Sequence, residues 1–136
     1  MYKVQVRIAD STIEGKGVFA EEDIPKDKVV WIFTANHDIL MTTDNFTALP
    51  NDTKLAMEKT GYISPWSGYW VFPPANDPAQ YTNHSSKNNL SAIFDAKVSA
   101  EPYFIANRNI KKGEELTNNY HEFDKITRDT KPSWAK

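Results

Sequence analysis

Apolar and polar positions alternate at the start of the chain, and short apolar runs separated by turn residues follow. Val4, Val6 and Ile8 alternate with polar neighbours, and this period of two predicts a half-buried strand. Further strands are expected where β-branched, aliphatic and aromatic residues cluster between turn residues. These runs are Val18–Ala20, Val29–Phe33, Tyr69–Phe72, Leu90–Phe94, Tyr103–Ala106 and Leu116–Tyr120. The pattern therefore predicts a mainly β fold of many short strands.

One short helix is expected in the polar stretch between the two groups of strands. Asp52 is its N-cap candidate, and Gly61 stands where a helix commonly ends. We interpret residues 34–68, which contain this helix, as an insert within a single domain of residues 1–124. Residues 125–136 are interpreted as a polar tail that is ordered only where something docks it.

An internal echo links two segments that lie far apart in the sequence. Residues 19–26 and residues 105–112 both read as strand, turn, strand, and both carry an isoleucine at the turn. Two copies are too few for a repeat array. They fit a compact fold of short paired strands.

Composition sets the class of protein. With 136 residues, 40% of them hydrophobic, the chain is long enough for one domain with a real core. A formal net charge of −2 argues against nucleic-acid binding through bulk positive charge. The absence of cysteine excludes disulfides and thiolate zinc sites. No apolar run reaches membrane-spanning length and no leader precedes Tyr2. We therefore expect a cytoplasmic protein, with a secreted or host-nuclear destination left open. As to its oligomeric state, a monomer or a homodimer is expected.

Three segments carry the candidate chemistry. Residues 14–20 hold a Gly-x-Gly turn, in which glycine permits positive φ and close approach to the backbone. Residues 80–90 concentrate amides, hydroxyls and an imidazole, which both donate and accept hydrogen bonds. Residues 113–120 read Gly-Glu-Glu-Leu-Thr-Asn-Asn-Tyr. Taken alone, the middle segment is as typical of a polar surface loop as of a binding site.

In this order and at these separations, the three segments resemble the SET-domain family of protein-lysine methyltransferases, in its short, stand-alone microbial and viral form. The resemblance covers about Val6 to Phe123. It implies a β-clip fold of small curved sheets with a short inserted helix. It also implies a pseudo-knot in which the last strand passes under the loop near residues 83–85, an arrangement that no pattern rule predicts.

The resemblance implies methyl transfer from S-adenosyl-L-methionine to a lysine ε-amine in a basic protein or peptide, such as a histone or a DNA-packaging protein. No metal, direct nucleic-acid contact or membrane contact is implied. Tyr120 is the implied catalytic residue and also a cofactor contact. The other implied cofactor contacts are Gly15, Lys16, Gly17, Tyr69, Asn83 and His84. Tyr81 and Asn118 are implied to line the substrate lysine channel together with Tyr120.

Plainer interpretations of these residues remain open. Without its motif, Tyr120 would be interpreted as a buried tyrosine in a strand. Tyr69 could equally be a residue that packs in the core. His84 could be a satisfied loop histidine. As a metal ligand it could be joined only by His37 and His121, and their spacing does not support such a site.

Some positions depart from the family pattern. Gln80 and Tyr81 stand where the family often has Arg-Phe, and Asn119 replaces the usual Asp before the tyrosine. Asn118 stands where an aromatic residue commonly tunes the number of methyl groups added. These departures motivate an alternative, a catalytically weak SET-fold module that holds a peptide or the cofactor.

Without cysteines, another group must close the lysine channel against water. The apolar residues after the last motif are Phe123, Ile126 and Trp134. We expect the tail to fold back, with Phe123 near the cofactor and Trp134 over the adenine or the channel mouth. A disordered terminus is the alternative.

Overall fold

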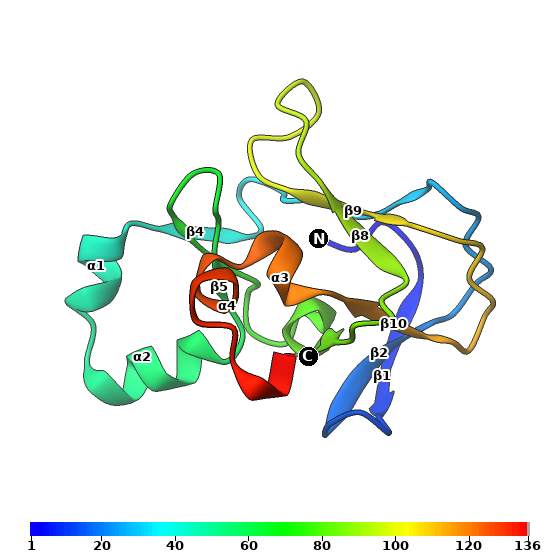
Figure 1. Ribbon diagram of the computed structural model, residues 1–136, viewed down its shortest axis with the longest axis horizontal. Coiled ribbons are helices and arrows are strands. Elements are labelled where there is room, and N and C mark those ends of the chain that lie inside the picture. The colour runs from blue at the N-terminus through cyan, green and yellow to red at the C-terminus, as the bar shows by residue number, and fades with distance from the viewer. Residues whose placement is uncertain (136) are drawn as a thin grey trace.

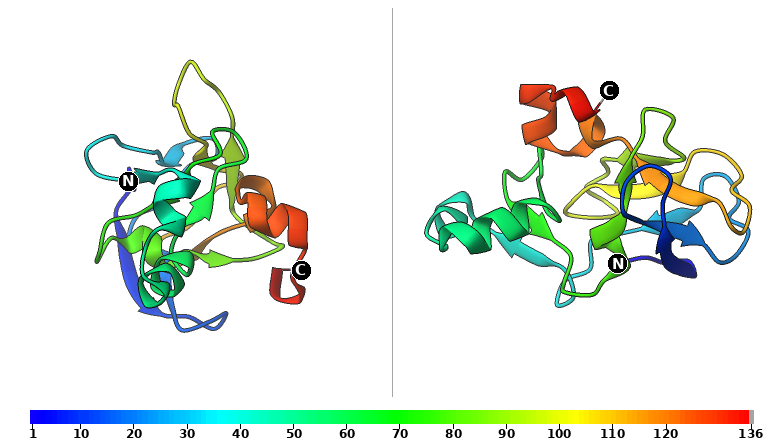
Figure 2. Two further views of the ribbon diagram at one scale, coloured as in Figure 1. Left: turned by 90° about the vertical axis from the view of Figure 1, so that its left-hand side faces the viewer. Right: turned by 90° about the horizontal axis from the view of Figure 1, so that it is seen from below.

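The structure, a computed structural model, describes residues 1–135 with the exception of the side chain of Trp134. The expectation that Trp134 covers the site therefore lies outside the described residues. In the described part of the chain, ten short strands form three small sheets. The expectation of a mainly β fold of small sheets is thereby confirmed. Figures 1 and 2 show α1 and α2 at one end of the molecule and the β1–β2 hairpin at the other.

The strands are β1 (Val6–Asp10), β2 (Lys16–Ala20), β3 (Val29–Trp31), β4 (Ile39–Met41), β5 (Tyr62–Ile63), β6 (Trp70–Phe72), β7 (Asn83–His84), β8 (Leu90–Ile93), β9 (Tyr103–Ala106) and β10 (Glu115–Asn118). The helices are α1 (Thr43–Thr47), α2 (Asn51–Glu58), α3 (Tyr120–Phe123) and α4 (Lys125–Thr130), with 3₁₀ turns η1 (Pro78–Tyr81) and η2 (Ser133–Ala135). None of the helices in the described residues is long and apolar enough to span a bilayer.

The sheet that matters most for the site has the strand order β1-β2-β10-β7. Strand β10 pairs antiparallel with β2 and parallel with β7, so that Leu116 lies opposite Val18 and Thr117 opposite Asn83. The amide of Ser85 also donates to the carbonyl of Asn118 at 2.9 Å. The three sequence motifs thus meet in one sheet, in the juxtaposition that the pseudo-knot expectation requires.

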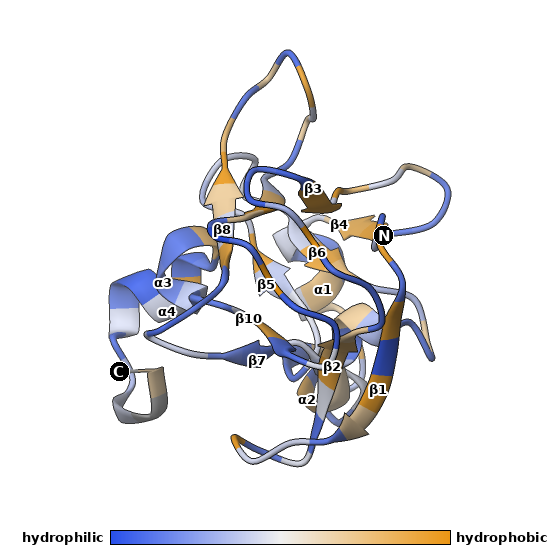
Figure 3. Cartoon of the chain, turned by 90° about the vertical axis from the view of Figure 1, so that its right-hand side faces the viewer, coloured by the Kyte–Doolittle hydropathy of each residue, from blue (hydrophilic) through white to orange (hydrophobic). Residues whose placement is uncertain are grey.

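Two apolar clusters hold the elements in place. The main core gathers fully buried side chains from β2, β3, β8 and β10, among them Val18, Val30, Leu90 and Leu116. A second cluster under the insert stacks Phe46 of α1 on Trp70 of β6 with ring centroids 4.2 Å apart. In Figure 3, β8 is hydrophobic and β7 is hydrophilic, as expected for a core strand and a site strand.

The internal echo has a direct structural counterpart. Ile24 and Ile110, the turn isoleucines of the two segments, exchange reciprocal backbone hydrogen bonds of 2.8 Å and both are buried. The two similar segments therefore pair with each other. This contact joins the first fifth of the chain to its last quarter.

The insert differs from the sequence expectation in its helices. It contains two, and α2 begins at Asn51 after Pro50, so Asp52 is not the N-cap. Proline fits a helix start because its missing N–H would have no partner there. The helix ends at Glu58, and Gly61 lies beyond its C-cap. A Cβ at Gly61 would lie 2.2 Å from the ring of Phe72, so packing explains this glycine.

The largest difference concerns Tyr120, which was expected at the end of a strand. Strand β10 stops at Asn118, and Tyr120 is the first residue of α3. The side chain of Asn119 accepts a hydrogen bond from the amide of His121 at 3.1 Å and caps the helix. Asparagine is among the best N-caps, so this residue turns the chain at the place where the strand was expected to continue.

Most of the described tail is helical, in α4 and η2. Asp124 caps α4 by accepting bonds from the amide and the hydroxyl of Thr127, which is buried. The imidazole Nε2 of His121 is hydrogen-bonded to the carbonyl of Ala135. Helices α3 and α4 thereby form one packed unit beside β5 (Figure 1).

Candidate active site

A cavity of about 940 Å³ lies where the Gly-x-Gly turn, the end of the insert, η1, β7, β10 and the C-terminal helices meet. Among the expected site residues, the structure brings Gly15, Lys16, Tyr81, Asn83, Asn118 and Tyr120 to its lining. Gly17 and His84 are next to lining residues in the chain but are not among them. Tyr69 is 43% exposed and does not line the cavity either.

The Gly-x-Gly turn is held against β10 by a compact polar network. The side-chain nitrogen of Asn83 lies 3.2 Å from the carbonyl oxygen of Glu14, 3.1 Å from that of Lys16 and 2.9 Å from Oε1 of Glu115. The hydroxyl of Ser11 donates to the same carboxylate at 2.8 Å. A Cβ on Gly17 would lie 2.1 Å from Glu115 Oε1. A side chain at position 17 would therefore displace this carboxylate from its bonds to Ser11 and Asn83.

Two residues of this network were not singled out from the sequence. Glu115 belongs to the third motif, and its position in the Gly-Glu-Glu-Leu-Thr run was the available signal. Asn89 belongs to the amide-rich segment. Its side chain donates to the carbonyl of Glu115 at 2.8 Å and accepts from the amide of Thr117 at 2.9 Å. Because Asn89 is almost fully buried, it fixes β10 beside the loop.

Lys16 is turned toward the hairpin. Its ammonium pairs with the carboxylate of Asp10 at 2.5 Å, and this hydrogen bond holds the pKa of Asp10 below its usual value. Both side chains are largely exposed, so the pair contributes little to stability. At the cavity, the turn therefore offers mainly the backbone groups around Gly15, which has φ +47°.

Tyr120 is fixed at both its backbone and its hydroxyl. Its amide donates to Nδ1 of His84 at 3.1 Å, and its hydroxyl donates to the carbonyl of Thr82 at 2.8 Å. An accepting Nδ1 places the proton of neutral His84 on Nε2. Burial raises the pKa of Tyr120 to about 12, so the hydroxyl is protonated at neutral pH. It can orient an amine and stabilise charge, but it is a poor general base there.

An aromatic wall closes one side of the cavity. Phe123 stands at its centre, with edge-to-face contacts to Tyr62 at 4.9 Å, Phe104 at 4.9 Å and Tyr120 at 5.5 Å between ring centroids. All four rings line the cavity. Phe123 itself is buried in the main core. An apolar wall of this kind excludes water from the groups beside it.

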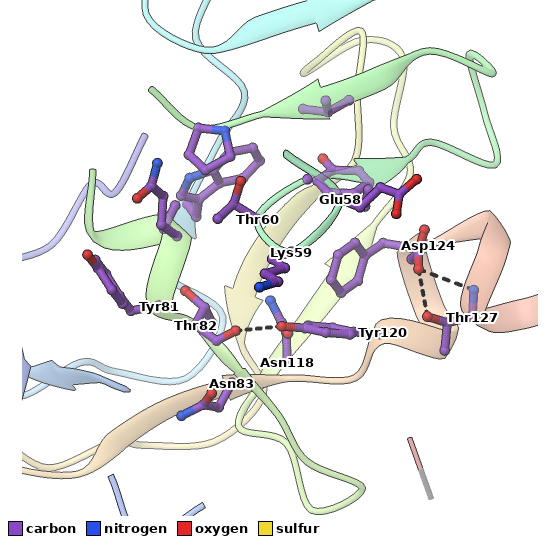
Figure 4. Close-up of a pocket in the computed structure, with 18 of the residues that line it drawn as sticks. Glu58, Lys59, Thr60, Tyr81, Thr82, Asn83, Asn118, Tyr120, Asp124 and Thr127 are labelled. Carbon is purple, nitrogen blue, oxygen red and sulfur yellow. Dashed lines mark hydrogen bonds between the residues drawn. The ribbon is translucent and has the colours of Figure 1, made fainter. Parts of the chain in front are cut away.

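Three residues that line this cavity have a buried polar atom with no hydrogen-bond partner among the described residues. These atoms are Nε1 of Trp31, the hydroxyl of Tyr62 and Oδ1 of Asn118. Burial raises the pKa of Tyr62, so its hydroxyl is also neutral. A buried polar atom without a partner costs about 1–3 kcal/mol. Such atoms beside a cavity are the groups that a bound ligand would satisfy. Figure 4 shows Asn118, Tyr120 and Thr82 gathered at the cavity floor.

No three His, Asp or Glu side chains in the described residues are grouped closely enough to hold a metal ion. His84 lies edge-to-face against Tyr120 at 5.3 Å and near His121 at 5.9 Å between ring centroids. Through these contacts His84 supports the start of α3.

The sequence model of the SET domain matches residues 15–121. The chain therefore belongs to the SET-domain family, as its motifs indicated. A Plasmodium falciparum protein with a provisional assignment as a histone methyltransferase matches at 20% identity with a TM-score of 0.54, over 85% of this chain and 91% of that one. The Chaetomium thermophilum Polycomb Repressive Complex 2 bound to GSK126 matches at 24% identity with a TM-score of 0.66, over 93% of this chain and 17% of that one. At these identities the structural likeness shows the fold alone.

Proposed function

We propose that this protein transfers a methyl group from S-adenosyl-L-methionine to the ε-amine of a lysine in a protein substrate. Membership of the SET-domain family supports methyltransferase activity in general terms. The observation that carries the specific proposal is the arrangement of Tyr120, Asn118 and Tyr62 around one aromatic-walled cavity. The hydroxyl of Tyr120 is fixed by the carbonyl of Thr82, and Tyr62 and Asn118 each bring to this cavity a buried polar atom that lacks a partner among the described residues.

The residues present fit the cofactor. S-adenosyl-L-methionine supplies an activated methyl group on a positively charged sulfur. The backbone around Gly15 and Lys16 would hold its methionine end, and the backbone of Asn83 and His84 its adenine. The amide of Asn83 supports both regions, since it bonds the glycine turn from within the middle motif. The expected contact from Tyr69 remains a prediction.

The acceptor lysine must be neutral before it can react. Its reference pKa of about 10.4 makes deprotonation at pH 7 cost roughly 4–5 kcal/mol. The wall of Phe104, Tyr62 and Phe123 disfavours the charged form by desolvation. Oδ1 of Asn118 would accept from the N–H of the amine and orient its lone pair. Alignment of this kind contributes several kcal/mol to catalysis.

The rival proposal is a catalytically weak binding module. It was suggested by Gln80 and Asn119, which depart from the SET-family pattern. In the structure both side chains have local roles. Gln80 donates to the carbonyl of Pro74 at 3.1 Å, and Asn119 caps α3. Neither departure removes the Tyr120 hydroxyl from the cavity. These contacts favour the enzyme over the module.

A protein or peptide substrate, basic in character, is part of the proposal. We expect the substrate peptide to pair as an added strand with an exposed sheet edge, between the insert and the C-terminal tail. The sheets of this fold are small and have open edges.

The test has two steps. Calorimetry should detect binding of S-adenosyl-L-methionine to the purified protein. Mass spectrometry should then detect methylated lysine in basic proteins, core histones first, after incubation with enzyme and cofactor. Cofactor binding without transfer to any protein would favour the module, and absence of binding would overturn both proposals.

A further inference from the structure

Lys59, the C-cap residue of α2, lies at the same cavity as Tyr120. In Figure 4 its side chain points into the cavity, toward Tyr120 and Asn118. None of the sequence motifs includes Lys59, and a lysine at the end of an exposed helix is ordinarily a solvated charge. Its side chain keeps solvent contact as well as lining the cavity.

The fold sets the position of this lysine. The amides of Thr60 and Gly61 both bond the carbonyl of Met57, so the chain turns sharply after α2. Gly61 then packs flat on the ring of Phe72. Two residues later the amide of Ile63 donates to Asp124 at 3.2 Å. The segment that carries Lys59 is therefore tied to β6 on one side and to the C-terminal helices on the other.

Two lysines line the cavity in the described residues, and only one is held by a partner. The ammonium of Lys16 is bound by Asp10. Lys59 has no ion pair or side-chain hydrogen bond to a described residue. A free amine on a tethered segment, facing the groups proposed to receive an acceptor lysine, has the high effective concentration of an intramolecular reactant.

We propose that Lys59 is a self-methylation site, methylated in cis by the cavity it enters. This inference rests on the proposed function. In the step, the neutral Nζ of Lys59 forms a bond to the methyl carbon of S-adenosyl-L-methionine. The carbon–sulfur bond breaks, its electron pair stays on sulfur in S-adenosylhomocysteine, and one proton is released to water overall. Until a protein substrate displaces it, Lys59 occupies the acceptor position.

The main test uses the protein alone with S-adenosyl-L-methionine that carries a deuterated methyl group. Peptide mass spectrometry should find the label on Lys59. Because the reaction is intramolecular, the labelled fraction at a given time should not change with protein concentration. Lys59→Arg should lose the label, whereas Lys125→Arg, at an exposed lysine paired with Asp129, should keep it. Label on Lys59 that rises with concentration would overturn the cis reaction.

A second readout does not depend on catalysis. S-adenosylhomocysteine fills the cofactor site without donating a methyl group, so it should slow acylation of Lys59 by an amine-selective reagent several-fold. Acylation of Lys125 should not change. Equal reactivity of Lys59 with and without S-adenosylhomocysteine would overturn the placement of its amine in the cavity.

Failure of this inference can be told from failure of the proposed function. If calorimetry shows binding of S-adenosyl-L-methionine and Lys59 stays unlabelled, self-methylation is wrong and the proposed function stands. Weaker cofactor binding in an unlabelled Lys59→Gln variant would identify the ammonium as a partner of the cofactor carboxylate and would also overturn self-methylation. If no cofactor binds, the proposed function fails and the inference fails with it.

Discussion

At the scale of single residues, the side-chain amide of Asn83 connects the most distant parts of the site. It lies within hydrogen-bonding distance of oxygens from Ser11, Glu14, Lys16 and Glu115. The first three belong to the N-terminal hairpin and the last to β10. One amide therefore sets the shape of the turn and its distance from the middle motif. Under the proposed function, Asn83 would act on the cofactor chiefly through the backbone that it positions.

Replacing Asn83 by alanine should weaken cofactor binding. Loss of a partly buried hydrogen-bonding side chain costs about 1–3 kcal/mol, and about 1.4 kcal/mol corresponds to a tenfold change in affinity. Calorimetry should show a dissociation constant for S-adenosyl-L-methionine raised by roughly tenfold or more. Ser86→Ala, at an exposed position on the same loop, is the matched control. Parental affinity in a folded Asn83→Ala protein would contradict the positioning role.

Replacing Tyr120 by phenylalanine should separate binding from chemistry. The ring keeps its contacts with Phe123 and His84, whereas the hydroxyl bond to Thr82 is lost. Removal of one group that stabilises a transition state costs about 10²–10³ in kcat. Cofactor affinity should stay close to that of the parent while single-turnover methylation slows by about this factor. Methylation at the parental rate would exclude Tyr120 as the catalytic residue.

At the scale of elements, local patterns predicted most of the strands but missed β4, β5 and β7, which have only two or three residues each. Strand β9 has the expected bounds, and β8 and β6 differ by a residue, because apolar runs between turn residues define them well. The strand predicted at β10 ran to Tyr120, two residues beyond the observed end at Asn118. The prediction did not recognise Asn119 as a helix N-cap. The comparison with the family pattern had noted this residue only as a replacement for the usual Asp. A side chain that captures a backbone amide outweighs strand propensity over the next residues.

Asp124 connects two segments that were predicted as separate, the insert and the C-terminal tail. It caps α4 and accepts the amide of Ile63 in β5. Asp124→Ala should lower the free energy of unfolding by about 1–2 kcal/mol, as loss of an N-cap does. It should also weaken cofactor affinity, because Ile126 and Thr130 of α4 line the cavity. Urea denaturation and calorimetry provide the two measurements.

Asp129→Ala is the control on the same helix, since among the described residues this exposed side chain pairs only with Lys125. It should change neither quantity appreciably. If Asp124→Ala lowers stability but leaves cofactor affinity at the parental value, α4 is a structural support rather than a wall of the site.

At the scale of the whole molecule, the site consists of contacts between segments that no local pattern relates. The motifs at residues 14–20, 80–90 and 113–120 could be found because each has a recognisable composition. The end of the insert has none, yet it contributes Lys59 and Tyr62 to the same cavity. Their positions depend on how β5 pairs with β6 and on the bond from Ile63 to Asp124. Tertiary placement of this kind is absent from the sequence pattern.

The same assembly withdraws the hydroxyls of Tyr2, Tyr62 and Tyr120 from water, and their ionisation should limit stability at high pH. Burial raises the pKa of Tyr2 and Tyr62, and it raises that of Tyr120 to about 12. Tyr2 and Tyr120 also share Thr82 as a partner, through its hydroxyl and its carbonyl respectively. In the unfolded chain each tyrosine ionises near pH 10. Between pH 10 and 12 the folded protein therefore holds more protons than the unfolded chain.

With more protons bound in the folded state, the free energy of unfolding must fall as pH rises through this interval. Each such tyrosine contributes a slope of about 1.4 kcal/mol per pH unit at most. The stabilisation is fully present below pH 10. Urea denaturation at several pH values from 8 to 12 should show the decline. In Tyr120→Phe the slope should be shallower by up to about 1.4 kcal/mol per pH unit, because one ionising group is gone. Equal slopes for the variant and the parent would show that the hydroxyl of Tyr120 is not buried as the structure describes.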